Sequence, residues 1–267
     1  MAIISVSRQI ASFGDELCEL IARHLNYKFI SRSDIENKLF ELGFSKTKLE
    51  RFDEKKPGFL SSLTNERDEY LDFLQLAILE LVSDDNCVII GRGSFSILKE
   101  FSNNISLRFV ADKKLRISRY KSEHSCSEKQ AVKIINESDS NREGFNKSFF
   151  NFDINNSALF HLVINTGLLD LEAISGFLEL LVEKSVTSEK SLLANKTIKS
   201  RLASQKIMIF LKYIEKIDIK FLRIESSEEN IFIYGTAESE ACVQKAVKTV
   251  KKEFPGYDVC PRISLED

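Results

Sequence analysis

Apolar and polar positions alternate between two patterns over the first 185 residues of the chain. Short runs of consecutive apolar residues are typical of buried strands, and between them apolar residues recur at the spacing of amphipathic helices. This alternation predicts an α/β fold with a parallel five-stranded sheet covered by helices on both faces. The expected strands are Ala2–Ser7, Tyr27–Ile30, Cys87–Ile90, Ile105–Val110 and Phe160–Ile164. The expected helices are Asp15–Leu25, Asp34–Leu42, Glu66–Val82, Lys113–Glu123, Glu128–Ile135 and Leu171–Glu183, with a loop at Phe52–Ser62.

The pattern changes where the chain turns polar, between Ser185 and Ser200. We interpret this stretch as a boundary between a domain at 1–185, a linker at 186–196 and a second domain at 197–267. The second part predicts the order αββαβ, which differs from the first and indicates an independent small α+β domain. Its expected elements are a helix at Thr197–Tyr213, strands at Ile217–Glu225 and Asn230–Gly235, a helix at Ser239–Phe254 and a strand at Tyr257–Ile263.

Composition and charge exclude several classes of partner and location. The formal net charge is −2, so no overall positive field is present to bind nucleic acid or an anionic membrane. The five cysteines show no metal-binding spacing and are expected to be reduced thiols, and no metal site is predicted. Neither a signal peptide nor a membrane-spanning run is recognisable, which predicts a cytoplasmic protein.

Ligands of parallel sheets bind at the carboxyl ends of the strands, and the first strand is followed there by a candidate phosphate loop. The segment Ser7–Glu16 (SRQIASFGDE) joins this strand to a helix, whose N-terminal N–H groups can bind phosphate. It lacks the lysine of a Walker A loop, and Asp15 and Glu16 would repel an anion, although Arg8 could partly replace the missing cation. The alternative is an ordinary capped helix, with Ser12 as one possible cap.

Further candidate residues are arginines that follow the third strand or lie on later helices. Gly91-Arg92-Gly93 could present a guanidinium to a phosphate, or could be a simple turn with a solvated arginine. Arg116 and Arg119 share one helix face, and Asp139 and Arg142 follow in the segment SDSNR. Paired arginines can stabilise a phosphoryl group during transfer, whereas solvated helix faces are the alternative.

Taken together, residues 2–183 resemble the cytidylate kinase-like family of P-loop-type nucleoside monophosphate kinases. The resemblance rests on the order of IISVSRQIASFGDE, CVIIGRG, LRFVADKKLRISRY, ESDSNR and HLVINTGLLDLEAI. It implies ATP-dependent phosphoryl transfer to CMP or dCMP, with Mg²⁺ bound through the nucleotide. It also implies roles for individual residues: Ser7, Arg8, Gln9, Ser12 and Gly14 would bind the phosphates of ATP, Arg32, Gly91 and Arg92 would bind the acceptor, and Arg116, Arg119, Asp139 and Arg142 would be catalytic.

The loop departs from the pattern of this family at three positions. Ala11 and Phe13 stand where the family has glycines, and Asp15 stands where it has an arginine. A residue with a β-carbon restricts the backbone conformations that a phosphate cradle needs. The sequence is therefore compatible with two functions: a kinase of low activity, or a non-catalytic protein that binds a nucleotide or another ligand and has a regulatory role.

Residues 197–267 resemble a BON domain through IDIKFLRIESSEENIFIYGTA and the helix that ends in FPGYDV. The resemblance implies contact with a membrane or a small ligand. No polybasic patch supports lipid binding, because Lys245, Lys248, Lys251 and Lys252 are typical of a solvated helix face.

Overall fold

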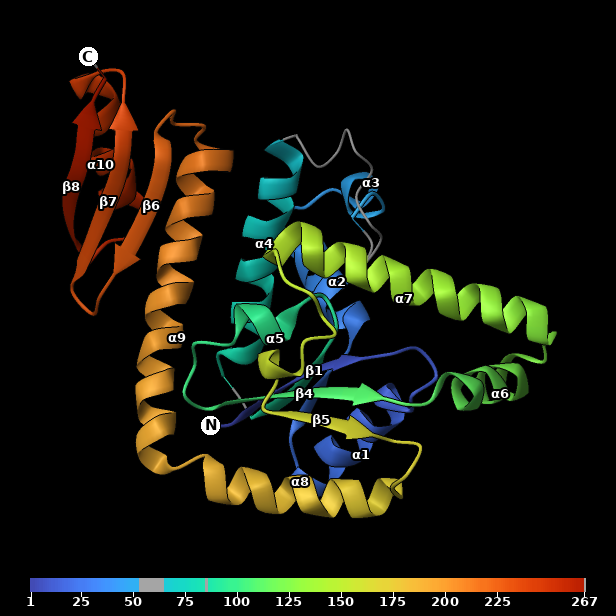
Figure 1. Ribbon diagram of the computed structural model, residues 1–267. Coiled ribbons are helices and arrows are strands. Elements are labelled where there is room, and N and C mark those ends of the chain that lie inside the picture. Colours follow the sequence, from blue (N-terminus) through green and yellow to red (C-terminus); the bar gives the residue numbers. More distant parts are fainter. Residues whose placement is uncertain (53–64, 85, 267) are drawn as a thin grey trace. The chain divides into compact units, whose positions relative to one another are not determined.

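The computed structural model describes residues 1–52, 65–84 and 86–266, which form two compact units, Met1–Ala194 and Asn195–Asp267 (Figure 1). Apart from Phe52, the loop predicted at Phe52–Ser62 lies outside the described residues. Each unit has its own sheet.

The N-terminal unit contains the parallel five-stranded sheet that the sequence predicts. Its strand order is β2-β3-β1-β4-β5, and every neighbouring pair of strands is parallel. The central position of β1 places the loop that follows it between the ends of β3 and β4. The strands are β1 (Ile3–Arg8), β2 (Lys28–Ile30), β3 (Cys87–Ile90), β4 (Asn104–Val110) and β5 (Leu162–Asn165).

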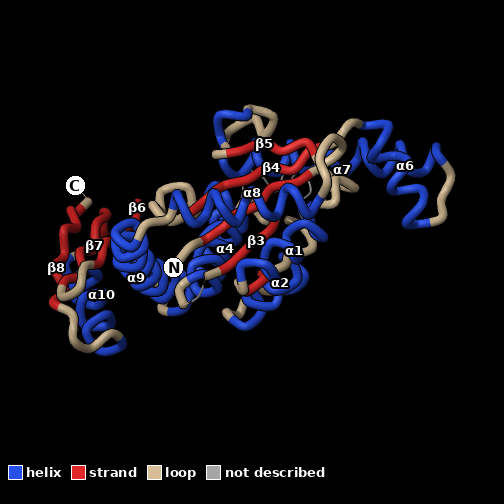
Figure 2. The backbone as a smooth tube through the Cα atoms, turned by 90° about the horizontal axis from the view of Figure 1, so that it is seen from below, coloured by secondary structure: helices blue, strands red, loops and turns tan. Residues whose placement is uncertain are grey.

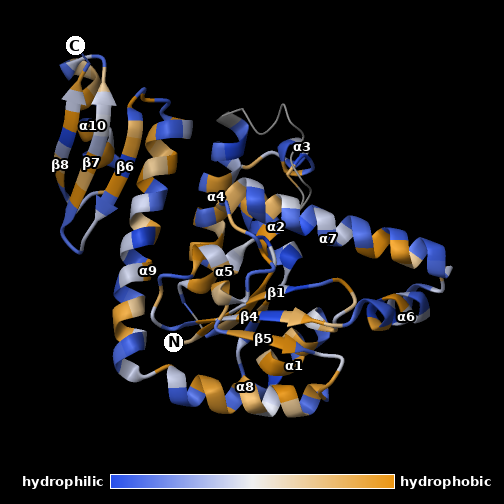
Figure 3. Cartoon of the chain, viewed as in Figure 1, coloured by the Kyte–Doolittle hydropathy of each residue, from blue (hydrophilic) through white to orange (hydrophobic). Residues whose placement is uncertain are grey.

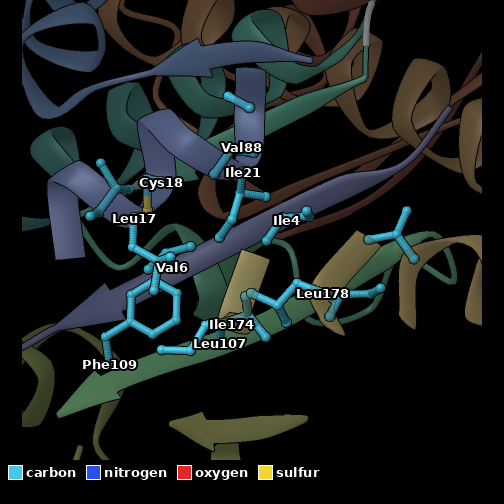
Figure 4. Close-up of a cluster of buried hydrophobic side chains, with 14 of the residues drawn as sticks. Ile4, Val6, Leu17, Cys18, Ile21, Val88, Leu107, Phe109, Ile174 and Leu178 are labelled. Carbon is cyan, nitrogen blue, oxygen red and sulfur yellow. The ribbon is translucent and has the colours of Figure 1, made fainter. Parts of the chain in front are cut away.

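One face of this sheet is covered by α1 (Gly14–Leu25) and α8 (Leu171–Ser185), as Figures 1 and 2 show. Alternate strand residues point into this layer and meet the apolar faces of the two helices, which appear as orange stripes in Figure 3. Burial of this cluster is the main stabilising contribution on this side of the sheet. Its centre is drawn in Figure 4 and includes Ile4, Val6, Leu17, Cys18, Ile21, Val88, Leu107, Phe109, Ile174 and Leu178.

The opposite face carries the site and is covered by a second group of helices. Aromatic rings from α4, α7 and the preceding loops pack together there, with the rings of Phe52 and Tyr70 stacked at 5.2 Å and Phe149 5.3 Å from Tyr70. The helices on this side and around it are α2 (Arg32–Glu41), α3 (Lys46–Leu49), α4 (Asn65–Val82), α5 (Ser94–Ile97), α6 (Lys113–His124) and α7 (Glu128–Phe150), followed by a 3₁₀ turn at Ser157–Leu159.

Helix α7 is longer than the sequence predicts. We expected it to end at Ile135, because the apolar periodicity is interrupted by the polar segment that follows. The helix continues for fifteen further residues to Phe150, since Phe145 and Phe149 restore the apolar spacing and are buried. This extension holds Asp139 and Arg142 on a rigid helix rather than in a loop.

The C-terminal unit has the order αββαβ that the sequence predicts. Strands β6 (Lys220–Ser226) and β7 (Asn230–Ala237) are antiparallel, and helix α10 (Glu240–Glu253) leads to β8 (Asp258–Leu265), which lies parallel to β7. The preceding helix α9 (Ser188–Ile209) starts earlier than expected, so most of the predicted linker is helical and the boundary between the compact units falls within α9. A π-helical turn at Phe210–Ile214 follows it. In the described part of the chain, no helix combines the length and apolar character needed to cross a membrane.

Candidate functional site

The loop between β1 and α1 bends as a phosphate loop would, but without glycine at its bends. Ala11 and Phe13 both adopt left-handed backbone conformations, with φ of 57° and 54°. Phe13 occupies the N-cap position of α1 and its side chain caps no N–H group. The Ser12 hydroxyl instead donates to the carbonyl of Gln9 at 2.8 Å, so Ser12 is not the helix cap that the alternative interpretation allowed.

The Arg119 side chain of α6 packs against this loop and holds it in place. Its guanidinium lies over the Phe13 ring at 3.9 Å from the ring centroid, and Nη1 is 3.5 Å from the carbonyl oxygen of Ala11. Nη2 donates to the Thr166 carbonyl at 2.9 Å, and the Thr166 hydroxyl donates to the carbonyl of Ser12 at 2.7 Å. A left-handed residue with a β-carbon costs roughly 1–2 kcal/mol, and these contacts offset that strain at Ala11 and Phe13.

The Arg8 side chain lies against Gly14 and Asp15, where the loop meets α1. Its guanidinium pairs with the Asp15 carboxylate at 3.2 Å, in the first turn of α1. Its aliphatic stem lies against Gly14, where an added β-carbon would be 2.5 Å from the Arg8 Cγ atom. Gly14 is therefore required for the close approach of Arg8.

Two features of the folded loop oppose binding of the phosphates of ATP. The Arg8 stem lies against Gly14, and the Asp15 carboxylate brings a negative charge to the helix end that would face the phosphates. Within the described residues, no group of three or more His, Cys, Asp or Glu could hold a metal ion.

A cleft with several arginines lies beside the loop, and we call it the arginine cleft. It consists of two adjoining compartments, each with about 300 Å³ of empty space that is partly open to solvent, and Arg8, Arg142 and Ile154 line both. The Arg92 compartment is also lined by Val6, Ser7, Gly91, Arg92, Gly93, Phe95, Phe145 and Asn146. The Arg108 compartment is also lined by Gln9, Arg108, Asp139, Glu143 and Asn155.

The turn after β3 buries its arginine. Gly91, Arg92 and Gly93 all have positive φ angles, of 91°, 52° and 68°. The Arg92 side chain is 0% exposed and donates to Glu36 Oε1 at 2.6 Å and to the Tyr70 hydroxyl at 3.0 Å. The interpretation of a solvated arginine is therefore wrong, because this guanidinium is buried and forms hydrogen bonds with protein groups.

Glu36 accepts hydrogen bonds from both Arg32 and Arg92, the two arginines that the family resemblance predicts to bind the acceptor nucleotide. Arg32 Nε donates to the same Oε1 atom at 2.7 Å, one helical turn away on α2. Burial raises the pKa of the Glu36 carboxyl, but the hydrogen bonds from Arg92 and Arg32 outweigh it, and the net pKa is lower than usual. Sequence reasoning missed Glu36, which shows no motif of its own.

This lowered pKa predicts a specific pH dependence of stability. Such a carboxyl adds stability that is fully present above its unfolded pKa of about 4.3 and is lost as the pH falls through the lower folded pKa. We expect the free energy of unfolding to decrease below about pH 4, and this part of the decrease to be missing in Glu36→Gln. Urea unfolding of both proteins from about pH 6 to about pH 3 measures it; equal slopes would contradict the assignment.

The four residues predicted to be catalytic are divided between three places. Arg116 is buried and forms a bidentate pair with Asp139, at 3.0 and 2.9 Å, which fastens α6 to α7. The Arg119 side chain packs against the loop between β1 and α1. Neither Arg119 nor Arg116 is among the residues lining the cleft. Arg142 lines both compartments and donates to the Ser138 hydroxyl of its own helix. Of the four, only Asp139 and Arg142 line the cleft.

Comparison with known proteins agrees with this architecture. The profile of the cytidylate kinase-like family matches residues 3–168. The chain belongs to the cytidylate kinase-like family. No curated protein matches the sequence.

Solved structures with a similar chain trace are found at low sequence identity. An uncharacterized protein from Eubacterium ventriosum is 18% identical, with a TM-score of 0.53 over 68% of this chain and 99% of that one. A shikimate kinase from Bacteroides thetaiotaomicron is 16% identical, with a TM-score of 0.43 over 68% and 98%. The YorR protein of Bacillus subtilis, in complex with phosphorylated GDP, is 17% identical, with a TM-score of 0.42 over 68% and 96%.

Two further cleft residues of this family member were missed at the level of sequence. Arg108 is a charged residue within an otherwise apolar strand, and that unusual position was the available signal. Asn146 is buried, and its Oδ1 atom has no hydrogen-bond partner in the structure, while its Nδ2 donates to the Arg142 carbonyl at 2.8 Å. No signal in the sequence pointed to Asn146, because it lies on the part of α7 beyond Ile135 that was not expected to be helical.

Proposed function

We propose that the N-terminal unit binds a nucleoside monophosphate, CMP or dCMP, in the arginine cleft, and that it catalyses phosphoryl transfer to it with low activity. The observation that carries this proposal is the position of Arg8 and Arg142 on the wall shared by both compartments. Guanidinium groups bind phosphate through charge-assisted hydrogen bonds, and the carboxyl edge of a parallel sheet is where ligands of such folds bind.

The remaining lining supports a ligand with a polar ring as well as a phosphate. The Asn146 Oδ1 atom is a buried acceptor without a partner, which a ligand N–H or O–H group would satisfy. The amino group of cytosine is such a donor.

We propose low activity because contacts within the loop hinder the binding of ATP, the phosphoryl donor. ATP would supply the phosphoryl group, and Mg²⁺ would be carried by the nucleotide, as in kinases generally. The Arg8–Asp15 pair and the Phe13–Arg119 contact would both have to open before phosphates could reach the loop. These two contacts also favour the second candidate function, a non-catalytic nucleotide-binding protein with a regulatory role.

A coupled assay of ADP release with ATP and a panel of monophosphates tests the proposal. We expect slow turnover with CMP or dCMP and less with AMP, GMP or UMP. Binding of CMP without any turnover would leave the non-catalytic function. Absence of both binding and turnover with every nucleotide would contradict the two functions together.

Restoring the loop provides a sharper test of why activity is low. The variant Phe13→Gly/Asp15→Arg removes the ring that Arg119 covers and replaces the carboxylate that pairs with Arg8. We expect its affinity for ATP to rise by about tenfold or more, because two opposing contacts are replaced by a free backbone and a cation. Titration calorimetry with ATP measures it.

The control for this variant is Glu19→Arg, which makes the same change of charge on an exposed position of α1, farther from the loop. A similar gain in the control would indicate a general effect of charge. No gain in the restored variant would contradict the interpretation that these two residues exclude ATP.

For the C-terminal unit we propose a BON-like domain, supported by the αββαβ order of its elements. Contact with a membrane or with a small ligand would follow from that resemblance. Co-sedimentation of the full chain with liposomes distinguishes them, because only membrane contact would remove the protein from the supernatant.

A further inference from the structure

Arg108 is a buried arginine in the middle of the sheet. It lies on β4, where its Cα is paired in register with Ser7 of β1 and Val163 of β5. Only 7% of the residue is exposed, and its side chain lines the Arg108 compartment. A cation at such a position is unfavourable unless a counter-charge is supplied.

The protein does not supply that counter-charge at close range. Arg108 Nη2 donates to the amide oxygen of Asn155 at 2.9 Å, and its guanidinium lies 5.7 Å from the centre of the Phe160 ring. It forms no ion pair with any carboxylate among the residues that the structure describes. Burial lowers the pKa of Arg108, while Asp139, Asp153 and Glu143 oppose this shift through longer-range attraction.

The two carboxylates that line the compartment form other hydrogen bonds. Asp139 is held by both terminal nitrogens of Arg116, and Glu143 accepts a hydrogen bond from the Asn155 amide at 3.0 Å. Arg92 differs in this respect, because the Glu36 carboxylate lies 2.6 Å from it. Of these two buried arginines lining the cleft, Arg108 is the one without a carboxylate in contact.

We propose that Arg108, rather than Arg92, provides the fixed positive charge that binds the phosphate of the ligand. The phosphate would occupy the Arg108 compartment, between Arg108 and the shared wall of Arg142 and Arg8. The rest of the ligand would extend into the Arg92 compartment towards Asn146. The identity of the ligand as a nucleoside monophosphate rests on the proposed function, whereas the assignment of its anion to Arg108 rests on burial and charge alone.

Two variants of the full chain test this assignment. Arg108→Gln removes the charge from the buried strand, and circular dichroism establishes whether it folds. Asn155→Asp leaves Arg108 in place and adds a carboxylate at an exposed position 2.9 Å from its Nη2 atom, so the ligand would meet a cation that is already neutralised. The matched control is Arg23→Gln, which removes an exposed arginine at the far end of α1.

Titration calorimetry with inorganic phosphate, CMP and cytidine gives the readout. We expect both variants to bind phosphate and CMP at least about tenfold more weakly than the unmodified chain, and Arg23→Gln to bind like it. Cytidine, which has no anion, should bind equally to the variants and the unmodified chain. Binding of CMP and phosphate by Asn155→Asp at unmodified affinity would overturn the role of Arg108.

The outcomes separate this inference from the proposed function. If phosphate binding depends on Arg108 but CMP adds nothing to it, the anion site stands and the nucleotide function fails. If CMP binds with an affinity that neither variant changes, the nucleotide function stands and the assignment to Arg108 fails. If the unmodified chain binds neither phosphate nor CMP, both fail.

Discussion

Arg142→Ala is expected to lower CMP-dependent ADP release by about a hundredfold or more, and to weaken CMP binding by about tenfold. Arg142 lines both compartments of the arginine cleft, so its guanidinium can reach a phosphate at either side of the shared wall. The fold should persist, because Arg142 is half-buried and its helix is held by the buried side chains of Phe145 and Phe149. The coupled assay and calorimetry measure the two effects.

Lys147→Ala is the control for this prediction, since Lys147 lies on the same helix and is exposed to solvent. It should change neither quantity. If Arg142→Ala also left turnover and CMP affinity at their original values, the proposed role of Arg142 would be wrong. If the unmodified chain has no turnover, the affinity alone decides.

Glu36→Ala is expected to reduce the free energy of unfolding by about 3 kcal/mol. The substitution removes a carboxylate that lies 2.6 Å from the buried Arg92 guanidinium, and with it a charge-assisted hydrogen bond away from solvent. The turn formed by Gly91, Arg92 and Gly93 should become less ordered, because its three left-handed residues are held in part through this pair. Urea unfolding followed by circular dichroism measures the loss.

Glu41→Ala is the matched control on the same helix. Glu41 pairs with Lys38 at 2.6 Å, but its side chain is 64% exposed, so its removal should cost less than about 1 kcal/mol. Equal losses in the two variants would show that Glu36 behaves as an ordinary surface carboxylate and does not stabilise the buried Arg92.

The fold could be predicted from the sequence because burial imposes a simple pattern on it. Strands of a parallel sheet are covered on both faces, so β3 is a continuous apolar run and β1 is a short buried run rich in Ile and Val. The end of α7 could not be predicted in the same way. Its polar segment at 136–144 breaks the periodicity. The helix continues because Phe149 packs against the distant ring of Tyr70, with Phe145 beside it.

The site was predicted less completely, because pairing over long distances in sequence determines it. The positions of the loop, of Arg92 and of Arg142 follow from their places after strands and in a charged segment. The partner of Arg92 does not, because Glu36 is 56 residues away and carries no local signal. Likewise, the contact between Arg119 and Phe13 is formed by segments that no spacing rule connects.

The most direct test of a nucleotide-binding cleft is a calorimetric titration of CMP into the full chain, with cytidine as the reference ligand. We predict one site with a dissociation constant below about 1 mM for CMP and much weaker binding of cytidine, because the phosphate contributes most of the affinity. Equal heats for CMP and cytidine, or no binding of CMP at millimolar concentration, would contradict the central claim that the arginine cleft binds a nucleoside monophosphate.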